Sequence, residues 1–174
     1  MRCFIALKIP EVVKKKIHKI QDILPGFYGK FTELENLHLT LKFLGEIDEE
    51  KLDKIKEKLK EIKLGKFNIN VKGLGVFSES FVKIVWLHLV GGEGLQRLID
   101  SKMEELGFVS EKRFMSHLTI ARVKTIRDRK KFLEDLYAIE VPEIEFKAEE
   151  FYLIKSELAK KGPEYTILEE CSLL

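Results

Sequence analysis

Hydrophobic and polar residues alternate along the chain in two periods, which together predict a succession of strands and helices. Apolar residues recur every three or four positions from Val13 to Leu24 and from Leu52 to Ile62, as they do along one face of a helix. Short apolar runs bounded by Pro, Gly or charged residues are typical of buried strands. Strands are therefore expected over residues 3–9, 37–44, 67–77, 82–90, 117–123, 144–155 and 165–173. Helices are expected after Pro10, Asp48 and Gly92, and over about residues 126–137.

The order of these elements repeats. A strand, a helix, a second strand and a second helix follow one another over about residues 2–62 and again over about residues 82–138. Such self-similarity indicates an internal duplication. No linker rich in Pro, Gly or Ser divides the two halves. We therefore expect a single domain over residues 1–174, made of two lobes around one cleft.

Each half carries one His-x-Thr-x tetrapeptide, at residues 38–41 (His-Leu-Thr-Leu) and 117–120 (His-Leu-Thr-Ile). Residues i and i+2 of a strand point to the same face, so each copy places an imidazole beside a hydroxyl. With the five Thr placed at random, two of the four His would have this spacing with a probability of about 0.005, so coincidence is a poor explanation. The other histidines, His18 and His88, lack a Thr at this spacing and are expected to be structural.

His38 and His117 together meet the needs of phosphate ester cleavage. Because an imidazole titrates near neutrality, a pair can present a neutral base and a charged acid at the same pH. The hydroxyls of Thr40 and Thr119 would donate hydrogen bonds to the nonbridging oxygens, where negative charge accumulates. The sequence holds no carboxylate cluster, no closely spaced His/Cys set and no phosphate-binding Gly loop. We therefore expect chemistry without a metal, ATP or another cofactor.

Composition narrows the classes of function. With 31 Lys and Arg against 29 Asp and Glu, the net charge is +2. The protein therefore lacks the overall positive charge of proteins that coat nucleic acid, but this balance does not exclude a local basic groove. Asn and Gln are scarce while Lys and Glu abound, a bias typical of proteins from hot environments. No signal peptide is visible and the apolar runs are too short to span a bilayer, so a cytoplasmic protein without membrane contact is expected.

The two cysteines, Cys3 and Cys171, lie near opposite ends of the chain and match neither a disulfide framework nor a metal cluster. Reduced, buried thiols are the leading interpretation. A bridge between them stays open if the terminal strands are neighbours, because proteins of thermophiles depart from the usual cytosolic rule.

Four stretches of the chain match a known family. They are Arg2-Cys3-Phe4-Ile5-Ala6-Leu7, Glu35 to Glu46, Phe114 to Arg122, and Ser156-Glu157-Leu158 followed by Gly162-Pro163-Glu164-Tyr165. Over nearly its whole length the chain resembles the 2H phosphoesterases, specifically the RNA 2′,3′-cyclic phosphodiesterases also described as 2′-5′ RNA ligases. The resemblance implies an α+β fold of two pseudo-symmetric lobes of antiparallel sheet, with outer helices around a central cleft.

The same resemblance implies hydrolysis of a terminal RNA 2′,3′-cyclic phosphate to a 2′-phosphate, and a reverse-type reaction that joins RNA ends through a 2′-5′ linkage. It implies that His38 is the proton donor to the leaving 3′-oxygen and His117 the proton acceptor that activates water, with Arg122 holding the phosphate. The expected partners are RNA ends, tRNA fragments among them, and the protein is expected to act as a monomer without a cofactor. Ser116 and Phe31 depart from the family pattern of Pro and Trp, which bears on substrate fit rather than on the chemical groups.

Two basic residues that follow the tetrapeptides are harder to place. Arg122 is five positions after His117, so strict alternation turns it away from the face that carries His117 unless a bulge or strand end redirects it. Lys42 shares the parity of His38 and Thr40, and it either reaches a phosphate or lies at an exposed strand end.

Two other functions fit the same residues. The site would also suit a small cyclic nucleotide or an ADP-ribose cyclic phosphate. In a third interpretation the protein is a binding module for RNA ends or tRNA fragments, with incidental turnover. Salt-dependent affinity that survives the loss of both histidines would favour this binding module.

Overall fold

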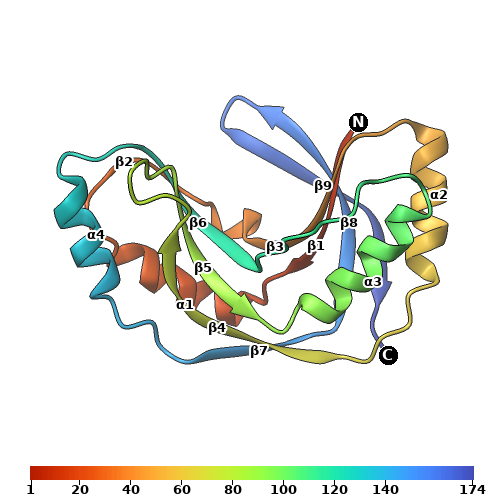
Figure 1. Ribbon diagram of the computed structural model, residues 1–174, viewed down its shortest axis with the longest axis horizontal. Helices are drawn as coiled ribbons and strands as arrows, with labels where there is room; N and C mark the ends of the chain where they lie inside the picture. Colours follow the sequence, from red (N-terminus) through yellow and green to blue (C-terminus); the bar gives the residue numbers. More distant parts are fainter.

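Two antiparallel sheets form the body of the molecule, which the computed structural model describes over residues 1–174 (Figure 1). Strands β1 (Arg2–Lys8), β3 (His38–Glu46), β8 (Glu150–Ala159) and β9 (Gly162–Ser172) form one sheet in the order β3-β1-β8-β9. Strands β2 (Tyr28–Phe31), β4 (Phe67–Val76), β5 (Ile84–Val90), β6 (His117–Thr125) and β7 (Ile144–Ala148) form the other in the order β2-β6-β5-β4-β7. The helices are α1 (Glu11–Asp22), α2 (Glu49–Lys60), α3 (Glu93–Glu104) and α4 (Arg129–Tyr137), with a 3-10 turn at Leu34–Asn36. The expected α+β fold of two antiparallel lobes with outer helices is confirmed.

The two lobes exchange helices. Helix α1 follows β1 of the four-stranded sheet but contacts β6 and β7 of the five-stranded sheet. Helix α3 follows β5 of the five-stranded sheet but contacts β3 and α2 on the other side (Figure 1). Each lobe is therefore completed by a helix from the other half of the sequence. In keeping with this exchange, 38 buried apolar residues drawn from both sheets form one continuous hydrophobic cluster.

Two of the four helices, α2 and α4, begin at an aspartate that caps them. The Asp48 carboxylate accepts a hydrogen bond from the Lys51 backbone N–H at 2.8 Å, as the sequence predicts for an N-cap residue. Asp128 caps α4 in the same way through the Lys131 N–H at 3.1 Å, so this helix starts three residues later than the apolar pattern indicates.

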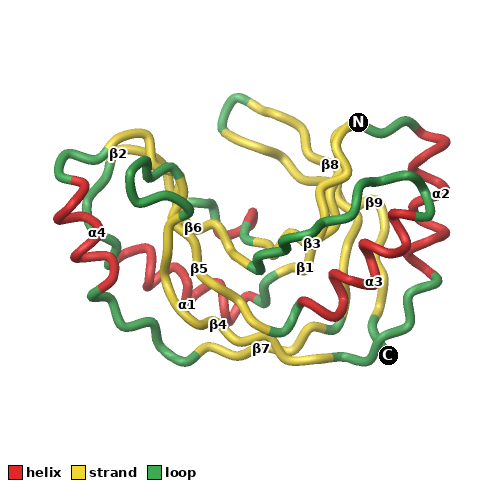
Figure 2. Tube along the Cα trace, viewed as in Figure 1, coloured by secondary structure: helices red, strands yellow, loops and turns green.

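The strand pattern departs from the sequence expectation in three places. The run over 144–155 is two strands, because β7 ends at Ala148 and the chain then crosses to the other sheet as β8. The sequence pattern does not predict strand β2, since its four residues are all exposed and show no alternation. The connection between β8 and β9 is only the two-residue turn Lys160-Lys161, and β9 begins at Gly162 with a positive φ of 143°, which favours glycine. Figure 2 shows that this hairpin projects beyond the rest of its sheet.

The two cysteines are buried and unbridged. Cys3 lies on β1 and Cys171 on β9, and β8 separates these strands in the sheet. The disulfide left open by the sequence does not form, because the strands that carry the thiols are not neighbours. Separately, none of the four helices is both long and apolar enough to cross a membrane.

Candidate active site

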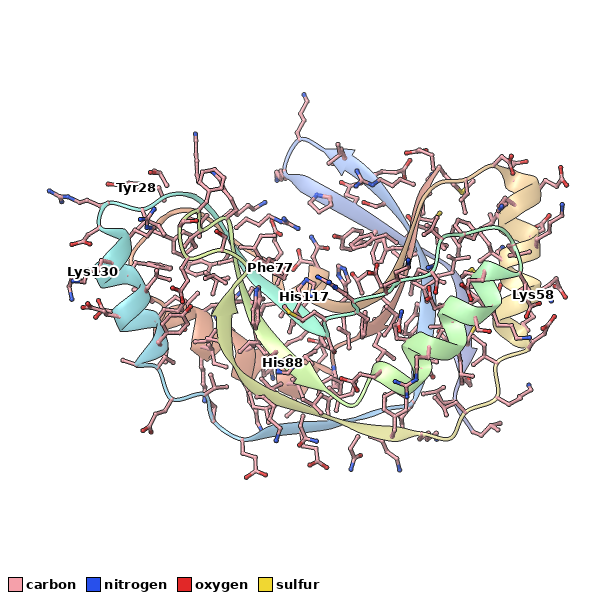
Figure 3. The ribbon with its side chains drawn as sticks, in the orientation of Figure 1. Tyr28, Lys58, Phe77, His88, His117 and Lys130 are labelled. Carbon is pink, nitrogen blue, oxygen red and sulfur yellow. The ribbon has the colours of Figure 1, made fainter.

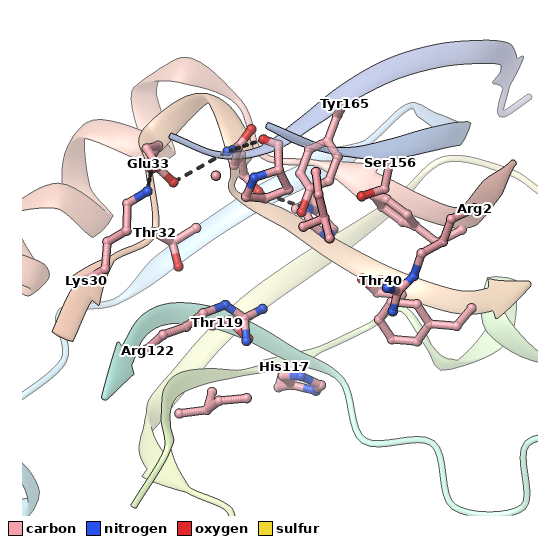
Figure 4. Close-up of a pocket in the computed structure, with 18 of the residues that line it drawn as sticks. Arg2, Lys30, Thr32, Glu33, Thr40, His117, Thr119, Arg122, Ser156 and Tyr165 are labelled. Carbon is pink, nitrogen blue, oxygen red and sulfur yellow. Dashed lines mark hydrogen bonds and ion pairs between the residues drawn. The ribbon is translucent and has the colours of Figure 1, made fainter. Parts of the chain in front are cut away.

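A cleft of about 800 Å³ lies between the two sheets and gathers the residues predicted from the sequence. His38 and Thr40 reach it from β3, and His117, Thr119 and Arg122 reach it from β6. Figure 4 shows Thr40 on one side and Thr119, Arg122 and His117 on the other. The two strands belong to different sheets, so each sheet contributes one imidazole and one hydroxyl. His38 and His117, which are 79 positions apart in the chain, thus line the same cleft.

Both imidazoles are held in the same way. The Nδ1 atom of His38 lies 2.7 Å from the backbone oxygen of Asn36, and Nδ1 of His117 lies 2.9 Å from the backbone oxygen of Met115. A carbonyl oxygen only accepts, so each Nδ1 carries its hydrogen and donates it. The tautomer is thereby fixed, and Nε2 is the nitrogen that can take or release a proton.

Aromatic rings hold each imidazole against its own sheet. The His38 ring lies 4.8 Å from Phe4 and 5.2 Å from Tyr165, measured between ring centroids. The His117 ring meets Phe77 edge to face at 5.0 Å, and Figure 3 shows the two side by side. Burial lowers the pKa of His38 below its ordinary value; the hydrogen bond to Asn36 opposes this effect, and the positive charge of Arg122 adds to it.

A β-bulge at the same position of both motif strands settles the placement of Arg122. Thr119 and Ala121 pair with consecutive residues of β5, so Ile120 is the extra residue on β6. Thr40 and Lys42 pair with consecutive residues of β1, so Leu41 is the extra residue on β3. Each bulge reverses the alternation, and the residue five positions after the histidine returns to the cleft face. Arg122 therefore lines the cleft, which strict alternation alone does not predict.

The same bulge turns Lys42 away from the cleft, and both interpretations of this residue from the sequence are wrong. Its side chain is buried and forms an ion pair with Asp100 of α3, while its ammonium also donates to the Val109 carbonyl at 2.8 Å. Burial raises the pKa of Asp100, but the hydrogen bonds from Lys42, the Glu111 N–H and the Ser110 hydroxyl outweigh it and hold the pKa below the ordinary value.

A buried glutamine supports the bulge of β6 from below. Gln21 of α1 is only 3% exposed, and its amide donates to the backbone oxygens of Ile120 and Thr32, at 3.0 Å each. Ile120 is the extra residue of the bulge, so this helix holds the strand segment that separates Thr119 from Arg122. The sequence does not indicate that Gln21 is buried against a strand, because a polar residue at the end of a helix is ordinarily expected to face solvent.

Further residues line the cleft, among them Arg2, Phe43, Ser156 and Tyr165. Arg2, Ser156 and Tyr165 fall within the stretches that carry the family resemblance, which is the one signal that could find them. Phe43 escapes prediction because it occupies, on β3, the position that Arg122 has on β6, and only the bulge shows that this position faces the cleft. Its side chain is 70% exposed.

The other two histidines lie outside the cleft lining. His18 is on the exposed side of α1, with Nε2 3.9 Å from a carboxylate oxygen of Asp22. His88 is half-buried on β5, directly across from His117 in the strand pairing. No three side chains among His, Cys, Asp and Glu come together as a ligand set for a metal ion.

Comparison with known proteins gives one consistent family. The family model described as LigT like Phosphoesterase matches residues 7–86 and 93–165, which include both His-x-Thr-x copies. An RNA 2′,3′-cyclic phosphodiesterase of Thermotoga maritima is 38% identical over 180 residues, which cover 98% of this chain and 95% of the relative. One of Methanocaldococcus jannaschii is 36% identical over 174 residues, covering 98% and 99%. Sources of this kind fit the composition bias towards hot environments.

Solved structures agree with the sequence relatives. TT0787 of Thermus thermophilus superposes with a TM-score of 0.80 at 31% identity, covering 99% of this chain and 97% of the other. E. coli LigT complexed with 3′-AMP superposes with a TM-score of 0.80 at 26% identity, over the same shares of the two chains. The arrangement of the two lobes is therefore one that is already seen in crystal structures.

Proposed function

Because the chain belongs to the LigT-like phosphoesterase family, we propose that it hydrolyses terminal RNA 2′,3′-cyclic phosphates to 2′-phosphates in the cleft between its two sheets. The observation that carries this proposal is the matched pair of imidazoles. His38 and His117 come from opposite lobes, and each has its Nδ1 tied to a backbone carbonyl, which reserves Nε2 for proton transfer. Since each lobe supplies one of the pair, the whole chain over residues 1–174 works as one unit.

The reaction needs two proton transfers, and the pair supplies both. His117 Nε2 takes a proton from water as the water oxygen attacks phosphorus. The bond from phosphorus to the 3′-oxygen breaks, and His38 Nε2 gives its proton to that oxygen. The product carries a 2′-phosphate and a free 3′-hydroxyl, and exchange with solvent restores the two histidines.

The neighbours of the imidazoles would stabilise the charge that develops on phosphate. Thr40 and Thr119 each follow a histidine by two residues on the cleft face, where their hydroxyls donate to nonbridging oxygens. Arg122 offers a planar guanidinium that suits two phosphate oxygens at once. Its charge also favours binding of the anionic substrate, which in turn favours the protonated form of His38 and opposes the effect of burial.

The proposal extends to the finer properties expected from the sequence. A 5′-hydroxyl in place of water would make the same steps join two RNA ends through a 2′-5′ linkage, by the reverse of cleavage. We expect RNA fragments with a cyclic phosphate at the 3′ end, such as those of tRNA, to be substrates. We expect the protein to act as a monomer, and the presence of both halves of the site in one chain supports this.

An RNA oligonucleotide with a 2′,3′-cyclic phosphate tests the proposal when it is incubated with the protein in EDTA and the position of the product phosphate is identified. Wild-type protein should give the 2′-phosphate. His38→Ala and His117→Ala should each lower turnover by about 10²–10⁴-fold, while His18→Ala, outside the cleft, retains it. Activity that EDTA abolishes and a metal restores, or single histidine variants with near wild-type turnover, would contradict the mechanism.

A further inference from the structure

The rim of the cleft differs in charge between the two lobes, although the strands that form it are copies of each other. Counted from the motif histidine, the seventh residue is Lys124 on β6 and Gly45 on β3. The tenth is Arg127 in one copy and Asp48 in the other. The twelfth is Arg129 after β6 and Glu50 after β3, so this position is also basic in one copy and acidic in the other. One rim is thus basic where its counterpart is neutral or acidic.

The basic rim is a continuous surface, termed the basic ridge and made of Lys83, Lys124, Arg127, Arg129 and the ring of Phe81. Lys83 donates to the Lys124 carbonyl at 3.4 Å, and its ammonium lies 4.4 Å above the Phe81 ring. The Arg129 guanidinium donates to the backbone oxygen of Ser80 in the same loop. The end of β6, the start of α4 and the loop before β5 are therefore held together (Figure 1).

The basic ridge leads directly out of the cleft. Arg122 lines the cleft, and Lys124 is the next residue on the same face of β6, about 7 Å further along the strand. Lys124 and Arg127 are exposed, and neither side chain has an ion-pair partner. Two acidic residues, Asp128 and Glu79, lie beside the basic ridge, and each is hydrogen-bonded to a group outside it. Asp128 caps α4, and Glu79 accepts from the Tyr137 hydroxyl at 2.9 Å.

The ridge has the chemistry of a path for single-stranded RNA. Unpaired cations spaced along a strand attract successive phosphates, and an exposed aromatic ring offers a base a surface to stack on. The Phe81 side chain is 66% exposed, with the Lys83 ammonium lying over its ring, so an aromatic surface and a cation are presented together. The acidic counterpart rim, where Asp48, Glu49 and Glu50 are exposed, would repel the same strand.

We propose that the RNA strand upstream of the cyclic phosphate leaves the cleft over the basic ridge of β6, α4 and the loop before β5. This inference rests on the proposed function, because it assumes that the terminal nucleotide occupies the cleft. It adds that the protein distinguishes an RNA end from a cyclic mononucleotide, since a mononucleotide has no upstream phosphates to reach the ridge.

A comparison of substrates of two lengths tests this path. The ridge variant is Lys124→Gln with Arg127→Gln, and the assay measures kcat/KM on adenosine 2′,3′-cyclic phosphate and on an RNA oligonucleotide that ends in the cyclic phosphate. Removing one cation that neutralises a phosphate of a single strand lowers the slope of log affinity against log salt by about 0.7. Removing two such cations lowers the slope by about 1.4. The loss of kcat/KM for RNA, measured as the ratio of wild type to variant, should therefore be about 25-fold larger at about 0.1 M salt than at about 1 M. Hydrolysis of the mononucleotide should change less than about twofold, because neither residue lines the cleft.

Two variants with the same change of charge serve as controls. Lys15→Gln with Lys16→Gln lies on exposed positions of α1, which packs behind the five-stranded sheet. Lys160→Gln with Lys161→Gln lies on the β8–β9 hairpin, at another side of the cleft mouth. The inference is supported if the ridge variant alone loses RNA turnover and salt dependence. It is overturned if the hairpin variant loses them instead, or if all three variants lose them equally. Failure of the wild-type protein on both substrates would instead overturn the proposed function.

Discussion

Replacing Lys42 by Met should destabilise the protein strongly without affecting substrate binding. Lys42 and Asp100 are a buried ion pair, with side chains 6% and 9% exposed. Met keeps the apolar stem of the lysine and removes the ammonium, so the Asp100 carboxylate would remain buried with only the Ser110 hydroxyl and the Glu111 N–H as donors. Breaking a buried pair from one side costs about 3–5 kcal/mol. In a chain of this length that corresponds to a drop of about 6–20 °C in Tm.

Thermal unfolding of two variants tests this reasoning. Lys42→Met with Asp100→Leu removes both charges, and it should recover most of the lost stability because no buried charge is left without a partner. A double variant as unstable as the single one would refute the argument. Kinetics give a second check, since Lys42 lies outside the cleft and KM should stay within about twofold of wild type. A large rise in KM would mean that Lys42 contacts phosphate after all.

The pH dependence of stability follows from the same pair. The pKa of Asp100 is lowered in the folded protein, so its contribution is present above the unfolded pKa of about 3.9 and is lost as the pH falls through the folded value. In Lys42→Met the carboxyl loses its main partner, and protonation relieves the buried charge. The difference in Tm between wild type and Lys42→Met should therefore narrow in acid. A difference that stays constant from neutral pH to about pH 3 would contradict this account.

Three further predictions concern the cleft. Thr40→Val and Thr119→Val should each slow the chemical step by about 10–10³-fold in single-turnover assays, and an unchanged rate would exclude a hydroxyl contact in the transition state. Because burial lowers the pKa of His38 in the free enzyme and bound phosphate opposes this, kcat/KM should decline at a lower pH than kcat as the pH rises; coincident declines would argue against His38 as the acid. Gln21→Met should lower kcat/KM about fivefold, the equivalent of one hydrogen bond, and this effect should vanish in an Arg122→Ala background. Equal losses in both backgrounds would show that Gln21 does not act through Arg122.

Much of the fold was predictable because it depends on short-range pattern. Each helix presents its apolar residues at helical spacing, and Asp48 supplies a cap whose role depends only on the residues next to it. The motif strands were predictable for the same reason, since Leu39 and Leu118 alternate with cleft residues and are both buried.

The division of the C-terminal strands was not predictable in this way. Residues 144–155 carry no Gly or Pro to interrupt the pattern, yet the chain changes sheet after Ala148. The change of sheet is visible only in the pairing partners of the two strands: β7 pairs with β4, and β8 pairs with β1 and β9. Those partners are distant in sequence, so periodicity carries no information about them.

The limits of sequence reasoning are clearest at the two bulges, because they decide which residues face the cleft. A bulge is a property of two paired strands, and alternation within one strand cannot reveal it. Strict alternation alone would turn Arg122 and Phe43 away from the cleft and Lys42 towards it, whereas the structure shows the reverse for all three. Since both copies bulge at the same position, the deviation is a feature of the motif strand and not of either lobe. The copies then diverge at the position that the bulge brings back to the cleft, with a guanidinium on one side and a phenyl ring on the other. The bulge thus keeps the backbones of the two motif strands alike, while the residues beyond it make the two sides of the cleft different.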